Sequence, residues 1–78
     1  MTHEVKILPQ YYSAVKANNK NFELRKNDRN YKIHDTLILR AWDGERYIEA
    51  EPLKREIKYI LSDCKDYGLA DGYVILGF

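Results

Sequence analysis

Short segments of alternating apolar residues, each closely followed by turn residues, most constrain what this chain can fold into. Alternation puts every second side chain on the same face, so each segment is expected to form a strand with one buried face. The clearest segment is 36–42, which Asp43-Gly44 follows as a hairpin turn. The other expected strands are 3–8, 21–25, 46–49, 55–61 and 73–78. Many short strands joined by frequent turns predict a mainly β fold.

One helix is expected directly after the first strand. Pro9 suits the first position of a helix, where its missing N–H costs no hydrogen bond. Tyr12 and Val15 follow at helical spacing, and Asn18 suits the helix end because asparagine tolerates the left-handed conformation. The predicted fold class is therefore mainly β (α+β), a small β-barrel with one main α-helix after the first strand.

The length of the chain and its residue types restrict the classes of protein to which it can belong. Its 78 residues fit one small domain spanning 1–78. The single cysteine excludes an internal disulfide framework, and neither histidine has a second ligand at metal spacing, so we expect no metal and no cofactor. No apolar run approaches the roughly 20 residues that span a membrane, so we expect a cytoplasmic protein without a membrane partner. The oligomeric state stays open.

The charges of the chain are unevenly distributed. Segment 16–32 holds six basic and two acidic residues, a net charge of +4, whereas the other residues include seven basic and ten acidic ones, a net charge of −3. The formal net charge of +1 therefore hides a local basic patch. Such a patch attracts phosphate or another anion even when the whole protein is nearly neutral. It holds too few cations to neutralise the many phosphates of a long duplex.

Lys20, Glu23 and Arg25 form the candidate site within this basic patch. In a strand, Phe22 and Leu24 would face the core, while Glu23 and Arg25 would share the opposite, polar face. Arginine can grip a phosphate with two parallel hydrogen bonds, and glutamate can accept one from a base amino group. Lysine can hold an anion or act as a base or nucleophile. The alternative interpretation is a solvated face that carries an exposed ion pair.

A resemblance to the activating-signal-cointegrator homology (ASCH) domain rests on the motif Lys20-x-x-Glu23-x-Arg25-Lys26-x-Asp28-Arg29, followed by Ile33-x-Asp35. The chain is most similar to the small bacterial and phage branch of that family, over roughly residues 3–77. Asn18 and His34 stand where the family usually has glycine, and both residue types can occupy turns with positive φ. The resemblance implies a PUA-like β-barrel.

The resemblance also implies a function, because PUA-like domains usually contact RNA in a cleft beside the barrel, next to the helix. We therefore expect a domain that binds RNA or a nucleotide-like ligand. The residues expected to take part are Lys20, Glu23, Arg25, Lys26 and Arg29 for polar contacts, and Tyr31, Trp42 and Tyr47 for stacking on bases.

Two alternative functions stay open. Some ASCH-like proteins are amidohydrolases that act on acylated cytidine, and their catalytic lysine corresponds to Lys20. Those enzymes have a threonine where this chain has Glu23, and they use a distal glutamate that the sequence does not assign here. An enzyme would need Lys20 buried and paired, with a second carboxylate across the pocket. A protein-interaction module would instead expose an apolar patch, for instance around Tyr11, Tyr12 and Phe78.

Overall fold

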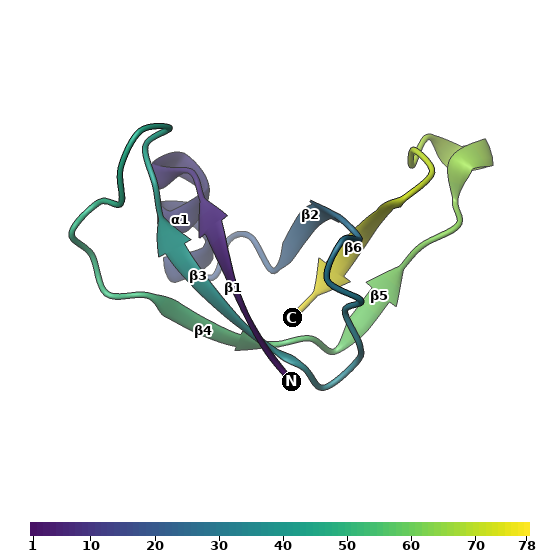
Figure 1. Ribbon diagram of the computed structural model, residues 1–78, viewed down its shortest axis with the longest axis horizontal. Helices are drawn as coiled ribbons and strands as arrows, with labels where there is room; N and C mark the ends of the chain where they lie inside the picture. The colour runs from purple at the N-terminus through teal and green to yellow at the C-terminus, as the bar shows by residue number, and fades with distance from the viewer.

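Two three-stranded sheets and one main helix make up the domain (Figure 1). The computed structural model describes residues 1–78. Its elements in chain order are β1 (Thr2–Ile7), α1 (Pro9–Lys16), β2 (Phe22–Lys26), β3 (Thr36–Ala41), β4 (Leu53–Glu56), β5 (Tyr59–Leu61), the 3₁₀ turn η1 (Lys65–Tyr67) and β6 (Tyr73–Gly77). The predicted mainly β fold with one helix after the first strand is confirmed.

The first sheet has the strand order β1-β3-β4, and the second has the order β2-β6-β5. β1 runs parallel to β3, which the helix α1 between them allows, and every other pairing is antiparallel. Figure 1 shows the two sheets spreading apart like the arms of a V, with α1 beside the first sheet. β1 and β2 are therefore edge strands of different sheets.

Segment 53–61 joins the two sheets. The sequence predicts one strand over 55–61, but the structure divides this segment into β4, which pairs with β3, and β5, which pairs with β6. Ile57 lies at the bend and is fully buried, and its backbone N–H donates to the Asp35 carbonyl at 2.8 Å. The prediction of one continuous strand is wrong because the segment changes its pairing partner at Ile57.

The predicted closed barrel is not formed, because the sheets do not meet between β1 and β2. No backbone ladder joins these two strands. Arginine side chains from β2 and from the loop that follows it donate to the β1 carbonyls instead. Arg25 Nη1 donates to the Lys6 carbonyl at 3.0 Å, and Arg29 Nη1 donates to the Glu4 carbonyl at 2.6 Å. We call this junction the seam; the two arginines satisfy acceptors that an uncovered edge strand would leave free.

The hydrophobic core lies between the helix and the inner faces of the two sheets. It consists of eleven buried side chains: Val5, Ile7, Tyr12, Val15, Tyr31, Leu37, Leu39, Ala41, Ile57, Val74 and Leu76. β1, β3 and β6 each bury alternate residues, because successive side chains of a strand point to opposite faces. The helix contributes Tyr12 and Val15, the two residues whose spacing predicted it.

The orientation predicted for β2 is wrong. Glu23 is only 5% exposed, whereas Phe22 and Leu24 are 47% and 56% exposed. The register explains the difference: Glu23 pairs with Leu76 and Arg25 pairs with Val74, so both polar residues lie on the face that carries the core. Strand alternation has a period of two, and exchanging its two faces moves every side chain to the opposite side.

The strand predicted at 46–49 is not formed. Only an isolated bridge between Trp42 and Tyr47 follows β3. The predicted turn at Asp43 is present, because the Asp43 carboxylate accepts hydrogen bonds from the backbone N–H groups of Arg46 and Glu45. Those two bonds lower the pKa of Asp43. The loop then continues to β4 without a strand ladder.

Two predicted turn positions have positive φ. Asn18 has a φ of 62° and His34 a φ of 77°, the left-handed conformation that asparagine and histidine adopt more readily than most residues. The helix itself ends at Lys16, slightly before Asn18. Asn18 and His34 therefore occupy a backbone conformation that glycine favours.

A buried polar cluster at the start of β1 was not predicted. His3 Nε2 lies 2.8 Å from Asp35 Oδ2, and the N-terminal amine donates to Asp35 Oδ1 at 3.0 Å. The His3 ring also packs edge-on against Tyr31, with 4.8 Å between the ring centroids. The His3 contact, and then the amine, lower the pKa of Asp35 from 3.8 to about 2.

This cluster predicts a loss of stability in acid. A carboxylate whose folded-state pKa is lowered stabilises the fold above its ordinary pKa, and that contribution disappears as the pH falls through the folded-state pKa. For Asp35 the window runs from about pH 4 to about pH 2. The thermal midpoint of the wild type should fall more steeply across this window than that of Asp35→Asn, which should be less stable at pH 7. Parallel pH profiles for the two proteins would contradict the assignment.

Candidate functional site

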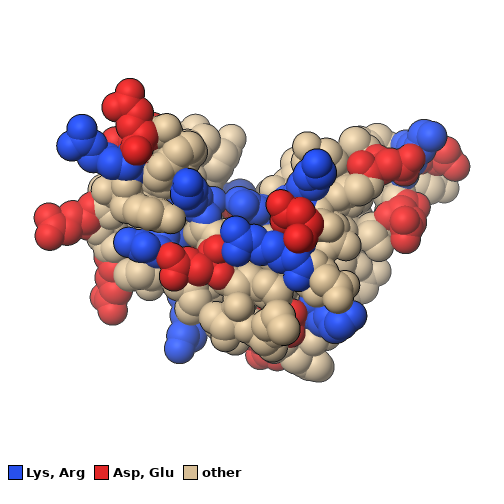
Figure 2. All heavy atoms as spheres, in the orientation of Figure 1, with Lys and Arg blue, Asp and Glu red and all other residues tan.

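A cleft of about 410 Å³ lies at the seam, where the end of β1, the start of α1 and β2 meet. We call it the seam cleft, and its lining residues are Lys6, Ile7, Leu8, Tyr11, Lys20, Phe22, Glu23, Leu24 and Arg25. Figure 2 shows Lys and Arg side chains gathered along the middle of the molecule, between the two arms of Figure 1. The cleft therefore lies where the basic segment of the chain meets the edge of the first sheet.

Lys20, Glu23 and Arg25 converge in this cleft. Lys20 Nζ forms an ion pair with Glu23 Oε1 and also donates to the Phe22 carbonyl at 2.7 Å. Arg25 Nη1 lies 3.6 Å from Glu23 Oε2. The buried carboxylate is thus held between two cations, as burial of a charge requires. The convergence expected from the spacing is present, although the cluster faces inward rather than toward open solvent.

Arg25 combines an anchored position with free hydrogen-bonding capacity. Its Nη1 contacts the Lys6 carbonyl and approaches Glu23, and its side chain is 27% exposed. A guanidinium carries five N–H donors, so these contacts leave donors that can reach a ligand in the cleft. The anchoring restricts the side chain before any ligand arrives, which lowers the entropy cost of binding.

Tyr11 and Phe22 supply aromatic surface in the cleft. Lys20 Nζ lies 5.3 Å from the centroid of the Tyr11 ring and 4.9 Å from that of Phe22. Both residues are about half exposed. Neither was predicted as a stacking residue, since Phe22 was expected in the core. Their position depends on which face of β2 is buried, and the alternating pattern alone does not reveal this.

Lys6 is the one charged lining residue that the sequence did not predict. It lies on the exposed face of β1, whose buried positions are His3, Val5 and Ile7. Lys6 belongs to no basic run, so only the packing of β1 beside β2 places it next to Arg25. The only sequence feature that could have indicated Lys6 is a single cation near the end of an alternating strand. That feature is too common to identify a site residue.

Three of the other predicted site residues lie elsewhere. The prediction that Tyr31 exposes a stacking ring is wrong, because Tyr31 is 6% exposed and packs on His3 in the core. Lys26 is exposed at the end of β2 and does not line the cleft. Arg29 holds the Glu4 carbonyl at the seam, outside the cleft lining.

The two remaining stacking candidates lie beside the cleft. Trp42 is half-buried, and Lys6 Nζ lies 4.6 Å from the centroid of its ring. Tyr47 is partly exposed and carries the Arg40 guanidinium, with Cζ at 3.8 Å from the ring centroid. Lys6 connects these aromatic residues to the seam cleft.

The cleft offers limited chemistry of its own. Glu23 is the only carboxylate among the lining residues, and it is already paired with Lys20 and Arg25. No group of three or more His, Cys, Asp or Glu side chains is placed to hold a metal ion. The arrangement therefore suits recognition of an anionic or planar ligand better than acid–base catalysis by two carboxylates.

No helix of this domain is long enough and apolar enough to cross a membrane.

The two sheets and the single helix define a small, mainly β domain. The family described as "Domain of unknown function (DUF3850)" matches residues 2–78, and the chain belongs to this family. The chain is also similar to an uncharacterised 12.9 kDa protein in the GpA 3′ region of Escherichia phage P2, with 50% identity over 75 residues. The match covers 95% of this chain and 64% of the phage protein, so the chain spans less than two thirds of that relative.

Proposed function

We propose that this domain binds RNA or a nucleotide-like ligand in the seam cleft. The observation that carries the proposal is the convergence of Lys20, Glu23 and Arg25 in one cleft, beside two partly exposed aromatic rings. A phosphate needs cationic donors and a base needs a flat surface, and this cleft has both within one cavity. The proposal therefore rests on the combination of groups rather than on the net charge.

Each side chain has a role in this proposal. Arg25 holds the phosphate, with Lys6 as a second positive charge on the opposite wall of the cleft. Glu23 orients Arg25 and Lys20, or accepts a hydrogen bond from a base amino group. Tyr11 and Phe22 supply the surface on which the base stacks. The Glu23 charge limits the net positive charge of the cleft, which favours a short ligand over a long, densely charged one.

We also propose that the fold is a PUA-like, ASCH-type barrel that is open at the seam. The order of a first strand, a helix and then the strand that carries the motif supports this proposal, and so does segment 53–61. Because β4 and β5 are two parts of that segment, the chain itself connects the two sheets there, whereas neither a ladder nor a shared segment connects β1 to β2. The seam cleft lies at this opening, next to α1.

The enzymatic alternative has partial support. Lys20 is largely buried and paired, its side chain being 15% exposed, as an amidohydrolase would require. The second carboxylate across the pocket is missing from the cleft lining, and Glu23 is the only acid there. Without a second acid, the chain lacks the pair that general acid–base hydrolysis of an amide would use. Ligand binding is therefore favoured over hydrolysis.

A protein-interaction module is the second candidate function, and one observation favours it. Tyr12 is buried, so the predicted patch around Tyr11, Tyr12 and Phe78 is not formed as expected. Apolar side chains lie instead on the outer face of the second sheet, where the exposed Leu24 and the partly buried Leu61 and Ile75 line a hollow of about 570 Å³. Binding of a protein would involve this face, which is distinct from the wall of the cleft formed by Glu23 and Arg25.

The salt dependence of binding tests the proposed function. Each phosphate of a single strand that a protein cation neutralises contributes about −0.7 to the slope of log K against log salt concentration. Lys6, Lys20 and Arg25, with one charge offset by Glu23, predict a slope no steeper than about −2 for a ten-nucleotide adenine RNA. Fluorescence anisotropy across a salt series measures the slope. A lack of binding, or a slope near −4 that indicates a general electrostatic surface, would refute the proposal.

A further inference from the structure

Four side chains form a stack of alternating cations and aromatic rings beside the seam cleft. Lys6 and Arg40 are paired residues on the neighbouring strands β1 and β3. Lys6 Nζ lies 4.6 Å from the Trp42 ring centroid and 5.9 Å from that of Tyr47. Arg40 Cζ lies 3.8 Å from the Tyr47 centroid. We call these four residues the cation–aromatic stack, and Lys6 is the one member that also lines the cleft.

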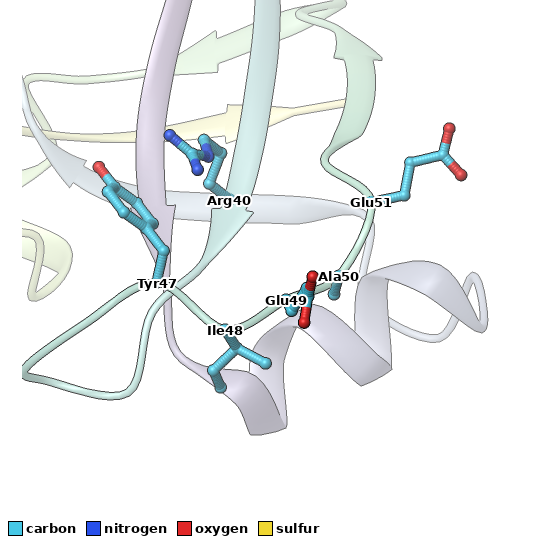
Figure 3. Close-up of a pocket in the computed structure, with 6 residues that line it drawn as sticks. All are labelled: Arg40, Tyr47, Ile48, Glu49, Ala50 and Glu51. Atoms are coloured by element: carbon cyan, nitrogen blue, oxygen red, sulfur yellow. The ribbon is translucent and has the colours of Figure 1, made fainter.

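A shallow hollow of about 480 Å³ opens next to this stack. Arg40 and Tyr47 line it together with residues 48–51 (Figure 3). Figure 3 shows the Arg40 and Tyr47 side chains next to each other and pointing the same way, while Glu51 extends away from them. The Glu4 carboxylate accepts a hydrogen bond from Arg40 Nη1 at 3.1 Å, which restrains the guanidinium beside the ring.

The chemistry of the hollow favours a base rather than a phosphate. A guanidinium plane and an aromatic ring are both surfaces on which nucleic-acid bases stack. Glu49 and Glu51 belong to the lining and repel a phosphate, and the Arg40 charge is already paired with Glu4. Lys6 lies between the hollow and the cleft and is the cation available for a phosphate that links two nucleotides.

We infer that the ligand is a single strand of at least two nucleotides, whose second base occupies the hollow beside Arg40 and Tyr47. This inference rests on the proposed function. The first base lies in the seam cleft against Tyr11 and Phe22, the linking phosphate lies at Lys6, and the second base stacks on the Arg40–Tyr47 pair. The hollow is thus a second nucleotide subsite.

Calorimetric titration with AMP and with the dinucleotide pApA tests this subsite. Stacking of one additional base is expected to make pApA bind about tenfold more tightly than AMP. Tyr47→Ala and Arg40→Ala should each remove most of this gain and leave only the part that the linking phosphate at Lys6 contributes. Tyr67→Ala should keep the gain near tenfold, because Tyr67 is 92% exposed on the η1 turn and belongs to neither site.

The outcomes separate the two proposals. If the wild type binds AMP but gains nothing from pApA, or if the gain survives in both Tyr47→Ala and Arg40→Ala, the second subsite is refuted and the cleft proposal stands. If the wild type binds neither AMP nor pApA, both proposals fail. A tenfold gain that is mostly lost in Tyr47→Ala and Arg40→Ala, and persists in Tyr67→Ala, supports the subsite.

Discussion

Leu39→Ala is expected to lower the free energy of unfolding by about 2–5 kcal/mol, whereas Leu24→Ala should change it by less than about 0.5 kcal/mol. Leu39 is fully buried on β3, the central strand of the first sheet, and Leu24 is 56% exposed on the outer face of β2. Removing the Leu39 side chain leaves a cavity in a close-packed core, whereas removing that of Leu24 leaves only solvent. A domain of this size has about 4–12 kcal/mol of stability, so Leu39→Ala removes a large part of it.

Urea unfolding of the wild type and both variants measures the difference. The two changes remove the same atoms from strand residues, so the comparison isolates burial. A loss in Leu24→Ala as large as that in Leu39→Ala would mean that Leu24 belongs to the core. The inward orientation of Glu23 and Arg25, and with it the seam cleft, would then be wrong.

Much of the fold follows from local patterns. β3 and β6 are apolar and alternating, and Pro9 marks the first residue of the helix, so these elements are predictable from neighbouring residues alone. Segment 46–49 was expected to form a strand because it follows a predicted hairpin turn, and it forms none, because pairing depends on what lies beside it in space. The division of segment 53–61 has the same cause: its two parts pair with strands that are far apart in the sequence.

The orientation of β2 shows what local patterns do not determine. Alternation separates Glu23 and Arg25 from Phe22 and Leu24, but it does not state which set is buried. The usual preference for apolar burial gives the wrong answer here. Glu23 can be buried because Lys20 and Arg25 offset its charge, and those contacts exist only in the folded chain.

Only the part of the candidate site that is built from residues close together in the sequence could be predicted. Lys20, Glu23 and Arg25 are close in sequence, and their spacing brings them together. Lys6 joins them only through the packing of β1 beside β2. The pair of His3 and Asp35 arises from the parallel pairing of β1 with β3, which places Thr2 opposite Thr36. A β1–β3 contact between segments more than 30 residues apart leaves no local signal.

Arg25→Ala is expected to weaken binding of AMP by about 10- to 100-fold. The guanidinium supplies charge-assisted hydrogen bonds, and losing such bonds costs about 1.5–3 kcal/mol. Arg25→Lys keeps the charge but loses the paired donors and the planar shape, so its affinity should lie between those of the wild type and Arg25→Ala. Because Arg25 also holds the Lys6 carbonyl, urea unfolding of each variant must show that the fold is retained.

The central claim is that the ligand binds in the seam cleft with its phosphate at Arg25, and Lys26→Ala is the matched control. Lys26 is the next residue on the same strand and is exposed outside the cleft, so this change removes one positive charge beside Arg25 without altering the cleft lining. The deciding measurement is the dissociation constant of AMP, by calorimetry, for Arg25→Ala and Lys26→Ala at the same salt concentration. We predict a loss of at least tenfold in Arg25→Ala and less than twofold in Lys26→Ala. Equal losses in the two folded variants, or none in Arg25→Ala, would contradict the seam cleft as the binding site.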